Sequence, residues 1–411
     1  MPQHTHCRIC QTALPEPFLD LGNMPLANSF LKAPSEFAGE AAYPLAVAGC
    51  PTCSLVQLTY VVPAEQLYRD YIYVSSTSDG VTAHADYLAK TLSKQYGWGA
   101  GDLILEVASN DGTVLKAFQR QGLPVLGVEP ALNIAKIAVA AGVPTVAEFF
   151  NAASAETVFA SHGQAAAILG RHVFAHIDNL HEFMEAVKRC LRPDGVLLIE
   201  VPYLRDFLEK REFDTIYHEH LSYVSLKAVE HLCAQHGMAL VDAETISLHG
   251  GSVIMHMRHA AASSGPSDRL RTLLAAEESL GLGRAERLAQ FARDVQEWKA
   301  RFEGLVRQLK ADGATLIGYG AAAKANTLLC YCPEAAASLA YILDRSSHKQ
   351  GKYTPGSHIK VEGVDYWQQG PRATHMVVLA WNFADEIMRQ MQPFADAGGR
   401  FVVPIPEPRV V

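Results

Sequence analysis

Short apolar runs alternate with longer amphipathic segments through the middle of the chain, from about residue 84 onward. Apolar runs between turn-forming residues predict buried strands, and the segments between them predict helices. Strand, helix and strand repeated in this order are typical of a parallel sheet with helices on both faces. The strands are expected at 103–107, 125–129, 165–169 and 196–200, the first helix at 113–120, and a turn at 191–195.

The C-terminal third predicts a linking helix and then a second unit of the same kind. Residues 268–311 are charged and helical in pattern, with apolar side chains three or four positions apart: Leu288, Phe291, Val295, Trp298 and Phe302. A strand at 314–319 then runs into the pattern Gly-x-Gly-x-x-Ala and a helix, and a strand at 341–344 ends in an acidic residue. This order outlines a second Rossmann-like unit.

Two CxxC pairs lie near the N-terminus, at Cys7 with Cys10 and at Cys50 with Cys53. Each CxxC turn directs two thiolates at one ion, and the two turns together complete a tetrahedron of sulfur ligands. The segment between them is rich in Pro and Gly and buries little by itself, so metal binding would supply its folding energy. The pattern predicts a closed, structural zinc site.

Composition favours a folded chain of two or three domains. Hydrophobic residues make up 49% and charged residues 19% of the 411 positions. The 35 Lys and Arg against 43 Asp and Glu give a net charge of -8, which argues against a nucleic-acid partner. No apolar stretch is long enough for a membrane helix, and reduced CxxC pairs suit the cytoplasm. We expect domains at 1–70, 71–265 and 266–411, and one chain is sufficient as a monomer.

The first turn of the middle domain is the candidate cofactor loop. Ligands of doubly wound sheets bind beyond the carboxyl ends of the strands. The segment from Glu106 to Gly112 resembles the acidic-x-Gly-x-Gly-x-Gly loop of class I SAM-dependent methyltransferases but keeps only its last glycine. Asn110 tolerates a positive φ and is expected to replace one of the others. Glu129, at the end of the next strand, suits the ribose hydroxyls. The expected SAM-binding residues are Glu106, Ala108, Asn110, Asp111, Gly112 and Glu129.

Titratable side chains gather in two further segments. Residues 217–223 read Tyr-His-Glu-His-Leu-Ser-Tyr, and His172 and His176 follow the third predicted strand. Such a cluster at the ligand-binding edge of a sheet fits proton transfer. A second metal site is the alternative, because His218 and His220 would share one face of a strand.

Taken together, these motifs resemble the SAM-dependent sugar C-3-methyltransferase family over nearly the whole chain. The match comprises the two CxxC pairs, Glu-x-x-Ser-Asn-Asp-Gly, His176, Tyr-His-Glu-His and a later Gly-Tyr-Gly-Ala-x-Ala-Lys. The resemblance implies a zinc-binding domain, a SAM-binding Rossmann-like core and a Rossmann-like C-terminal domain. It also implies a dTDP- or GDP-linked 4-keto-deoxy-hexose as substrate, methylated at C3 through an enolate.

The resemblance also implies the roles of individual residues. His220 would remove the C3 proton, Glu219 would orient it or contact the sugar, and Tyr217 or His176 would donate to the enolate oxygen. A tyrosine after the zinc module also reaches the site in this family; Tyr71 is favoured as catalytic and Tyr73 as substrate-binding. The chain has His172 where the family has Asn, which leaves the contacts around that position open.

The C-terminal unit has two interpretations. Its Gly-x-Gly-x-x-Ala pattern alone fits an NAD site, or else a diphosphate at the helix N-terminus. The family resemblance favours the diphosphate of the substrate. The expected substrate-binding residues here are Lys324, Asn326, Lys352 and Tyr353, with His249 in a glycine-rich stretch nearby.

Three other functions remain open from the sequence. A zinc-ribbon RNA methyltransferase also places CxxC pairs before a SAM domain, but the negative charge argues against it. A non-enzymatic nucleotide-binding protein with a degenerate SAM loop and an NAD-dependent oxidoreductase are the others.

Overall fold

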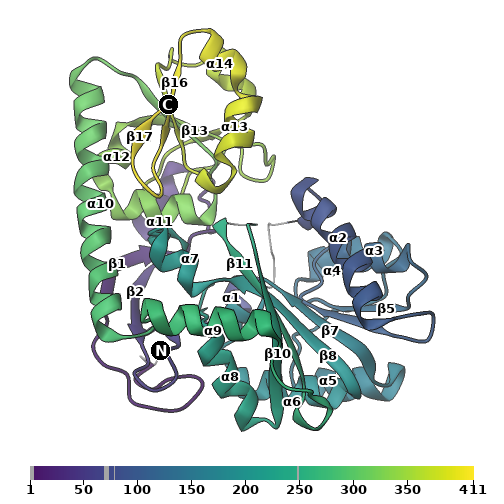
Figure 1. Ribbon diagram of the computed structural model, residues 1–411. Helices are drawn as coiled ribbons and strands as arrows, with labels where there is room; N and C mark the ends of the chain where they lie inside the picture. Colours follow the sequence, from purple (N-terminus) through teal and green to yellow (C-terminus); the bar gives the residue numbers. More distant parts are fainter. Residues whose placement is uncertain (1–3, 69–73, 78, 248–249) are drawn as a thin grey trace.

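The computed structural model describes residues 4–68, 74–77, 79–247 and 250–411, which form three β-sheets with their helices. In Figure 1 the first three strands of the N-terminal sheet are purple, the middle sheet runs from blue to green, and the C-terminal sheet is green to yellow. Each of the two larger sheets packs with helices, so both parts of the chain have an α/β fold, as the sequence predicts. None of the helices that these residues form is long and apolar enough to cross a membrane.

The N-terminal sheet takes its last strand from a distant part of the chain. Its order is β1-β2-β3-β9, and every neighbouring pair is antiparallel. The first three strands precede residue 60, whereas β9 follows the Tyr-His-Glu-His segment directly. That segment is thereby held between the N-terminal module and the middle domain. The strands are β1 (Leu19–Pro25), β2 (Ala42–Gly49), β3 (Val56–Leu58) and β9 (Ser222–Tyr223).

The middle sheet has the order β10-β11-β8-β7-β4-β5-β6. The five strands from β8 to β6 are parallel, and β11 runs antiparallel to both of its neighbours. The strand order reverses at β4, so the switch point for a ligand lies beyond β4 and β7. The strands are β4 (Ile104–Val107), β5 (Val125–Val128), β6 (Thr145–Val146), β7 (Ala165–Arg171), β8 (Leu191–Pro202), β10 (Met238–Ile246) and β11 (Ser252–His259).

Helices cover both faces of this sheet because the strands are apolar on both sides. Along β4, Ile104 packs into one hydrophobic cluster, and Leu105 and Val107 pack into the other. The first cluster lies under α2 (Asp79–Tyr96), α3 (Thr113–Gln119) and α4 (Leu132–Ala140). The second lies under α5 (Ala152–His162), α6 (Leu180–Cys190) and α8 (Leu226–Gln235).

The predicted turn at 191–195 is wrong, because these residues belong to β8. Ala165 pairs with Leu191, but Ala167 pairs with Val196, so residues 192–195 bulge out of the ladder. Pro193 has no N–H and Gly195 packs closely, which suits an irregular strand better than a regular one. The strands predicted at 103–107, 125–129 and 165–169 lie within two residues of their expected bounds, whereas the strand predicted at 196–200 begins five residues earlier.

The C-terminal sheet has the order β14-β13-β12-β15-β16-β17 and is parallel except for β17. Its strand order reverses between β13 and β15, on the two sides of β12. Its elements are β12 (Leu316–Tyr319), α11 (Ala323–Tyr331), α12 (Pro333–Ser338), β13 (Leu339–Leu343), β14 (Val361–Glu362), β15 (His375–Val378), α13 (Ala384–Gln390), α14 (Gln392–Asp396), β16 (Arg400–Val403) and β17 (Arg409–Val410).

The predicted linking helix at 268–311 is two helices, α9 (Asp268–Leu280) and α10 (Ala285–Ala311). The break falls at Gly281 and Gly283, which both adopt a positive φ. The five predicted apolar positions are buried on α10. There they share one core with strands of the N-terminal and C-terminal sheets. The Trp298 Nε1–H also donates to the Pro404 carbonyl at 2.8 Å. Helix α10 therefore joins these two parts along its length (Figure 1).

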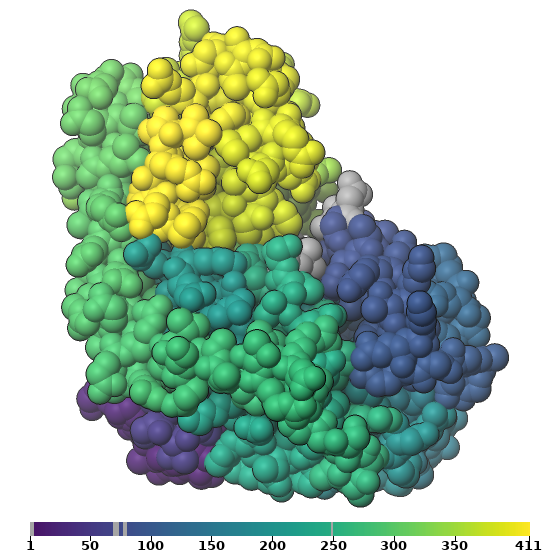
Figure 2. Space-filling view, in the orientation of Figure 1, coloured from purple at the N-terminus to yellow at the C-terminus, as the bar shows by residue number. Residues whose placement is uncertain are grey.

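The expected domain boundaries at residues 70 and 265 stay predictions, and β9 shows that the N-terminal module also uses a later segment. In the space-filling view, the yellow C-terminal part lies above the teal and green middle part of the chain (Figure 2).

Candidate active site

A single large cleft brings the three parts of the chain together. Its volume is about 990 Å³. The N-terminal part contributes Asn28 and Tyr68, the middle sheet contributes residues beyond β4, β5 and β7, and the C-terminal sheet contributes the segments after β12 and β13. We call this space the central cleft. Both switch points of the two doubly wound sheets therefore open into it.

The loop at the end of β4 has the backbone of a glycine loop although it contains only one glycine. Ala108, Asn110 and Gly112 have φ of 53°, 51° and 76°. These are the three glycine positions of the class I pattern. Asn110 takes the positive φ that the sequence suggested, and Ala108 takes it as well. A left-handed alanine costs about 1–2 kcal/mol, so the surrounding contacts hold the loop in this form.

Glu129 and the segment before α2 provide those contacts. The Glu129 carboxylate accepts the N–H of Asn110 at 2.8 Å and of Ala131 at 2.9 Å. The Asn110 side chain accepts the N–H of Ser75 at 2.9 Å, and the Asp111 carboxylate accepts the N–H of Ser76 at 3.1 Å. Burial raises the pKa of Glu129, and these backbone donors oppose that shift.

Glu106 is a buried acid at the bottom of the same site. Burial raises its pKa to about 8, and the neighbouring Arg171 guanidinium opposes this. Its Oε2 atom has no hydrogen-bond partner among the described residues. A buried carboxyl without a partner is costly, so a cationic ligand in the cleft would satisfy it.

His220 is held by hydrogen bonds at both ring nitrogens. Its Nδ1 lies 2.9 Å from the Thr215 carbonyl and its Nε2 lies 2.7 Å from the Tyr217 hydroxyl. A carbonyl only accepts, so Nδ1 carries the proton and Nε2 accepts from Tyr217. Burial lowers the pKa of His220 well below the usual value, and the neighbouring His176 lowers it further. His220 is therefore neutral near pH 7, with an unprotonated Nε2 beside the cleft.

His176 and Glu219 lie next to this base. The His176 ring is perpendicular to the His220 ring, with centroids 5.1 Å apart. The Tyr68 hydroxyl contacts His176 Nδ1 at 2.8 Å and the Glu219 carbonyl at 3.1 Å. The Asn28 side chain donates to Glu219 Oε1 at 2.6 Å. Burial lowers the pKa of His176 to about 3.

The alternative of a second metal site at His218 and His220 is wrong. Residues 217–220 form a turn rather than a strand. The buried His218 points to the Pro44 carbonyl at 3.2 Å, whereas His220 points to Thr215 and Tyr217. Among the described residues, only the four N-terminal cysteines form a group suited to a metal ion.

Beyond β12, the C-terminal sheet presents a helix N-terminus and several cations to the cleft. No side chain caps the start of α11. Lys324 lies 4.4 Å from the Trp381 ring centroid, and Lys349 donates to the Ala321 carbonyl at 2.8 Å. Arg345 and His348 line the same end of the cleft.

Three predicted substrate-binding residues lie away from the cleft lining. Asn326 is buried and donates to the Ala27 carbonyl at 2.6 Å. Tyr353 pairs through its backbone with Leu31, and its ring packs against Phe37. Lys352 lies beside it, whereas the nearby Lys349 reaches the cleft. The predicted Tyr71, Tyr73 and His249 lie outside the described residues.

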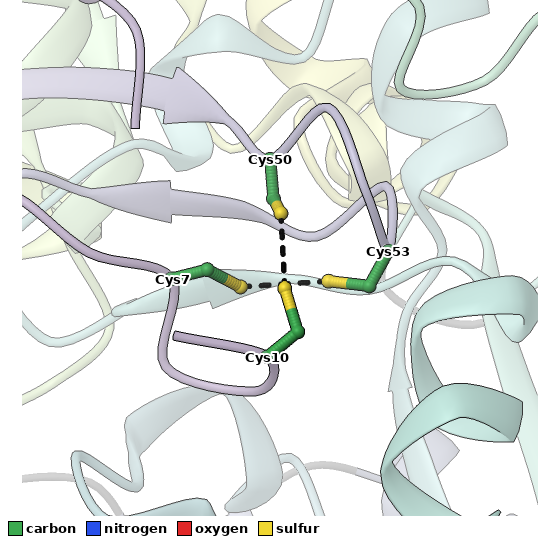
Figure 3. Close-up of side chains that lie close together, drawn as sticks. All are labelled: Cys7, Cys10, Cys50 and Cys53. Carbon is green, nitrogen blue, oxygen red and sulfur yellow. Dashed lines mark hydrogen bonds between the residues drawn. The ribbon is translucent and has the colours of Figure 1, made fainter. Parts of the chain in front are cut away.

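The four cysteine sulfurs converge on one point (Figure 3). All lie within 4.8 Å of one another, with 3.4 Å between Cys7 and Cys53 and 3.3 Å between Cys10 and Cys50. A tetrahedral zinc with sulfur ligands needs separations of about 3.8 Å. Small movements of the cysteine side chains would give this separation. Four protein ligands leave no open coordination position for water or substrate. The site fits structural zinc.

Hydrogen bonds join the zinc module to the segment that contains His220. Buried Arg8, between Cys7 and Cys10, donates to the Leu221 carbonyl at 3.1 Å and to Asp178 at 3.2 Å. Leu58 N–H also donates to the Leu221 carbonyl at 3.0 Å. The zinc site therefore supports the residue that follows the candidate base.

A curated relative matches this chain from end to end. The C-methyltransferase NovU of Streptomyces niveus is 37% identical over 412 residues, which cover 98% of this chain and 96% of that protein.

The chain belongs to the C-methyltransferase family.

Three family models match successive parts of this C-methyltransferase, although β9 and β11 each pair with a sheet outside their own model. A zinc binding domain matches residues 7–68, a methyltransferase domain 85–243, and a C-methyltransferase C-terminal domain 247–406. The enzyme is thus a SAM-dependent C-methyltransferase with a zinc-binding N-terminal domain.

Solved structures resemble this C-methyltransferase only distantly. PH0226 protein from Pyrococcus horikoshii OT3 is 14% identical and matches 46% of this chain and 94% of its own, with a TM-score of 0.36. Magnesium protoporphyrin IX methyltransferase from Synechocystis PCC 6803, with bound SAM, is 10% identical and matches 44% and 80%, with a TM-score of 0.34. Likenesses this low carry no argument about function.

Sequence reasoning missed several residues of this site. Glu200, at the end of β8, accepts from Arg171 at 3.2 Å, His172 at 3.0 Å and His84 at 2.8 Å. These cationic and imidazole partners hold its pKa well below the usual value despite burial. Glu200 is a single acidic residue near the end of a strand and belongs to no sequence motif that would have identified it. Asn28 and Tyr68 were missed because they lie about 190 and 150 positions from Glu219.

Zinc removal tests the structural role of the cysteine site. Cys10→Ser should lower the zinc content and reduce the free energy of unfolding by more than about 4 kcal/mol, because the metal supplies folding energy. Zinc analysis and thermal unfolding measure both. Cys330→Ser, outside the cluster, is the matched control and should retain zinc. Equal zinc content in the two variants would contradict the assignment.

Ala108→Gly tests the strained loop. Removing a left-handed alanine should stabilise the protein by about 0.5–1 kcal/mol, after the larger entropy of unfolded glycine is subtracted. Ala117→Gly, in the interior of α3, is the control, and it should destabilise because glycine is a poorer helix former than alanine. Urea unfolding measures both. Equal destabilisation by the two changes would show that Ala108 is not strained.

Proposed function

We propose that this C-methyltransferase methylates C3 of a nucleotide-linked 4-keto-deoxy-hexose through an enolate. The observation that carries this proposal is the Tyr217–His220 pair in the lining of the central cleft, to which residues 108–110 and the start of α11 also contribute. A base at this position is close to the ligands of both Rossmann-like sheets. A linked donor beside the base suits a ketone whose neighbouring carbon loses a proton.

The cofactor would occupy the end of the cleft beyond β4. The methionine part of SAM would contact the loop that contains Ala108, Asn110, Asp111 and Gly112. Glu129 would bind the ribose hydroxyls of SAM. SAM supplies a methyl group on a sulfonium sulfur. The Glu106 Oε2 atom, which lacks a described partner, suits that cationic ligand because a nearby positive charge favours the ionised carboxylate.

The substrate would enter from the C-terminal side. The start of α11 offers backbone N–H groups and the positive end of the helix dipole to a diphosphate. Lys324 and Lys349 add charge. Burial lowers the pKa of Lys324, while the nearby Asp214 and Glu212 carboxylates oppose that shift. We propose Lys324 for the diphosphate, and Lys349 in place of the predicted Lys352.

The proton chemistry follows from the hydrogen bonds of His220. In the structure the Tyr217 O–H occupies Nε2 of His220. We propose that this hydroxyl turns to the ketone oxygen when the sugar binds, which frees Nε2 and supplies a donor to the developing enolate. The C3–H electron pair moves into the enolate, and Nε2 takes the proton. The enolate carbon would then take the methyl group that bound SAM supplies, which re-forms the ketone and leaves S-adenosylhomocysteine.

The proposal also gives roles to the neighbouring residues. Glu219 is positioned by Asn28 and is assigned to the sugar; Tyr71, Tyr73 and His249 keep their predicted roles, although they lie outside the described residues. The described part of the chain supplies lining residues to the cleft from all three sheet regions, and we propose that a monomer is sufficient. Four zinc-binding thiolates suit a reducing compartment, and we expect the enzyme to act in the cytoplasm.

Solvent exchange tests the enolate directly. In D₂O, wild-type enzyme should deuterate C3 of a nucleotide 4-keto-6-deoxy sugar, and with SAM it should add a methyl group to that carbon. His220→Ala should reduce both by about 10²–10⁴-fold, because it removes the general base. Mass spectrometry and NMR of the sugar detect both. The exposed His162→Ala serves as the control and should retain both activities.

The pH dependence gives a second readout of the same assay. The base acts when neutral, and burial lowers the pKa of His220. Activity should therefore persist as the pH falls below 6.5 and decline only at more acidic values. Methylation at oxygen or nitrogen, or no deuterium at C3, would refute the enolate mechanism.

A further inference from the structure

The Tyr68 hydroxyl contacts both the Glu219 carbonyl and the His176 ring. These two contacts determine which nitrogen of His176 carries the proton. Tyr68 ends α1 (Ala64–Tyr68), the helix that follows the zinc module. Its oxygen lies 3.1 Å from the Glu219 carbonyl oxygen and 2.8 Å from His176 Nδ1. The hydroxyl has one proton, and a carbonyl oxygen only accepts. The Tyr68 proton is therefore directed to Glu219, and His176 Nδ1 must donate its own proton to the Tyr68 oxygen.

His176 consequently has a fixed tautomer. Burial lowers the pKa of His176 to about 3, so the ring is neutral near pH 7. A neutral imidazole carries one proton, and that proton lies on Nδ1. Its Nε2 is then an acceptor. No described residue bonds Nε2, and His176 lines the central cleft.

This tautomer excludes one role and indicates another. A ketone or enolate oxygen needs a donor, so neutral His176 does not stabilise it, contrary to the sequence expectation. His176 lies with its ring centroid 5.1 Å from that of the proposed base, and both residues line the central cleft. Under the proposed function, its Nε2 would therefore face the substituent on the carbon that loses its proton. A hydroxyl or amino substituent there provides the N–H or O–H that Nε2 accepts.

We propose that Tyr68 is a positioning residue that fixes His176 as the Nδ1–H tautomer, so that Nε2 accepts a hydrogen bond from a hydroxyl or amino group on C3 of the substrate. The second half of this statement rests on the proposed function, whereas the tautomer does not. The substrate class is thereby narrowed to sugars with a hydrogen-bond donor on the methylated carbon.

The tautomer is measured by imidazole ¹⁵N NMR on the full-length enzyme with ¹⁵N-labelled histidine. His176→Asn assigns the His176 signals by their loss. Wild-type enzyme should show a protonated Nδ1 and an unprotonated Nε2 at neutral pH. Tyr68→Phe should shift the population toward the Nε2–H form. Tyr366→Phe is the matched control, because that ring packs on Tyr341 away from the cleft, and it should leave the signals unchanged. An Nε2–H tautomer in wild type, or no change in Tyr68→Phe, would overturn the proposal.

Substrate recognition is measured by kinetics on paired sugars. A 3-deoxy-4-keto analogue retains an acidic C3–H but lacks the donor. With wild-type enzyme its kcat/KM for C3 deuteration should be about tenfold lower than that of the 3-hydroxy or 3-amino sugar, as for one lost hydrogen bond. Tyr68→Phe should lose about tenfold on the natural type of sugar and little on the analogue. Equal losses on both sugars would overturn the recognition role. Absence of C3 exchange in wild type would refute the proposed function and leave the tautomer result intact.

Discussion

The site depends on the burial of two histidine rings away from water. His176 and His220 lie side by side, and burial lowers the pKa of each, so both stay neutral. A neutral imidazole has one donor and one acceptor nitrogen, and the partners of each ring decide which is which. Thr215 fixes His220 and Tyr68 fixes His176, each through Nδ1. Both rings therefore direct an acceptor Nε2 at the groups around them. Two unprotonated nitrogens in one place can accept protons and hydrogen bonds, and neither can donate.

The zinc module takes part in this arrangement through protein contacts alone. A closed four-sulfur site offers no position to substrate, yet Arg8 within it bonds to Leu221, directly after His220. The pairing of β3 with β9 holds the residues that follow Leu221. Asn28 and Tyr68 extend from this part of the chain to Glu219 and His176. Metal binding, at a distance from the chemistry, thereby stabilises the segments that hold the proposed base and its neighbours.

Much of the fold could be predicted from the sequence because its signals are local. Apolar strands, turn residues and CxxC spacing depend on neighbouring positions, and they predicted both doubly wound sheets and the zinc site. The bulge in β8 and the break before α10 were missed, because a Pro-Asp-Gly segment and a pair of glycines each allow more than one local structure. The candidate site was predicted less completely. His176, Tyr217, Glu219 and His220 lie close together as the motifs indicated, but Asn28, Tyr68 and Glu200 depend on contacts between distant segments. Tertiary packing also buried Asn326, which by motif alone resembled a ligand contact.

The account requires both ligands and the base to share the central cleft. The most direct test is a crystal structure of the enzyme with S-adenosylhomocysteine and a nucleoside diphosphate both bound. We predict that the homocysteine sulfur lies at the end of the cleft beyond β4, that the diphosphate lies at the start of α11, and that the His220 imidazole faces the space between them. A diphosphate bound outside the cleft, or a sulfur separated from His220 by protein, would contradict the account.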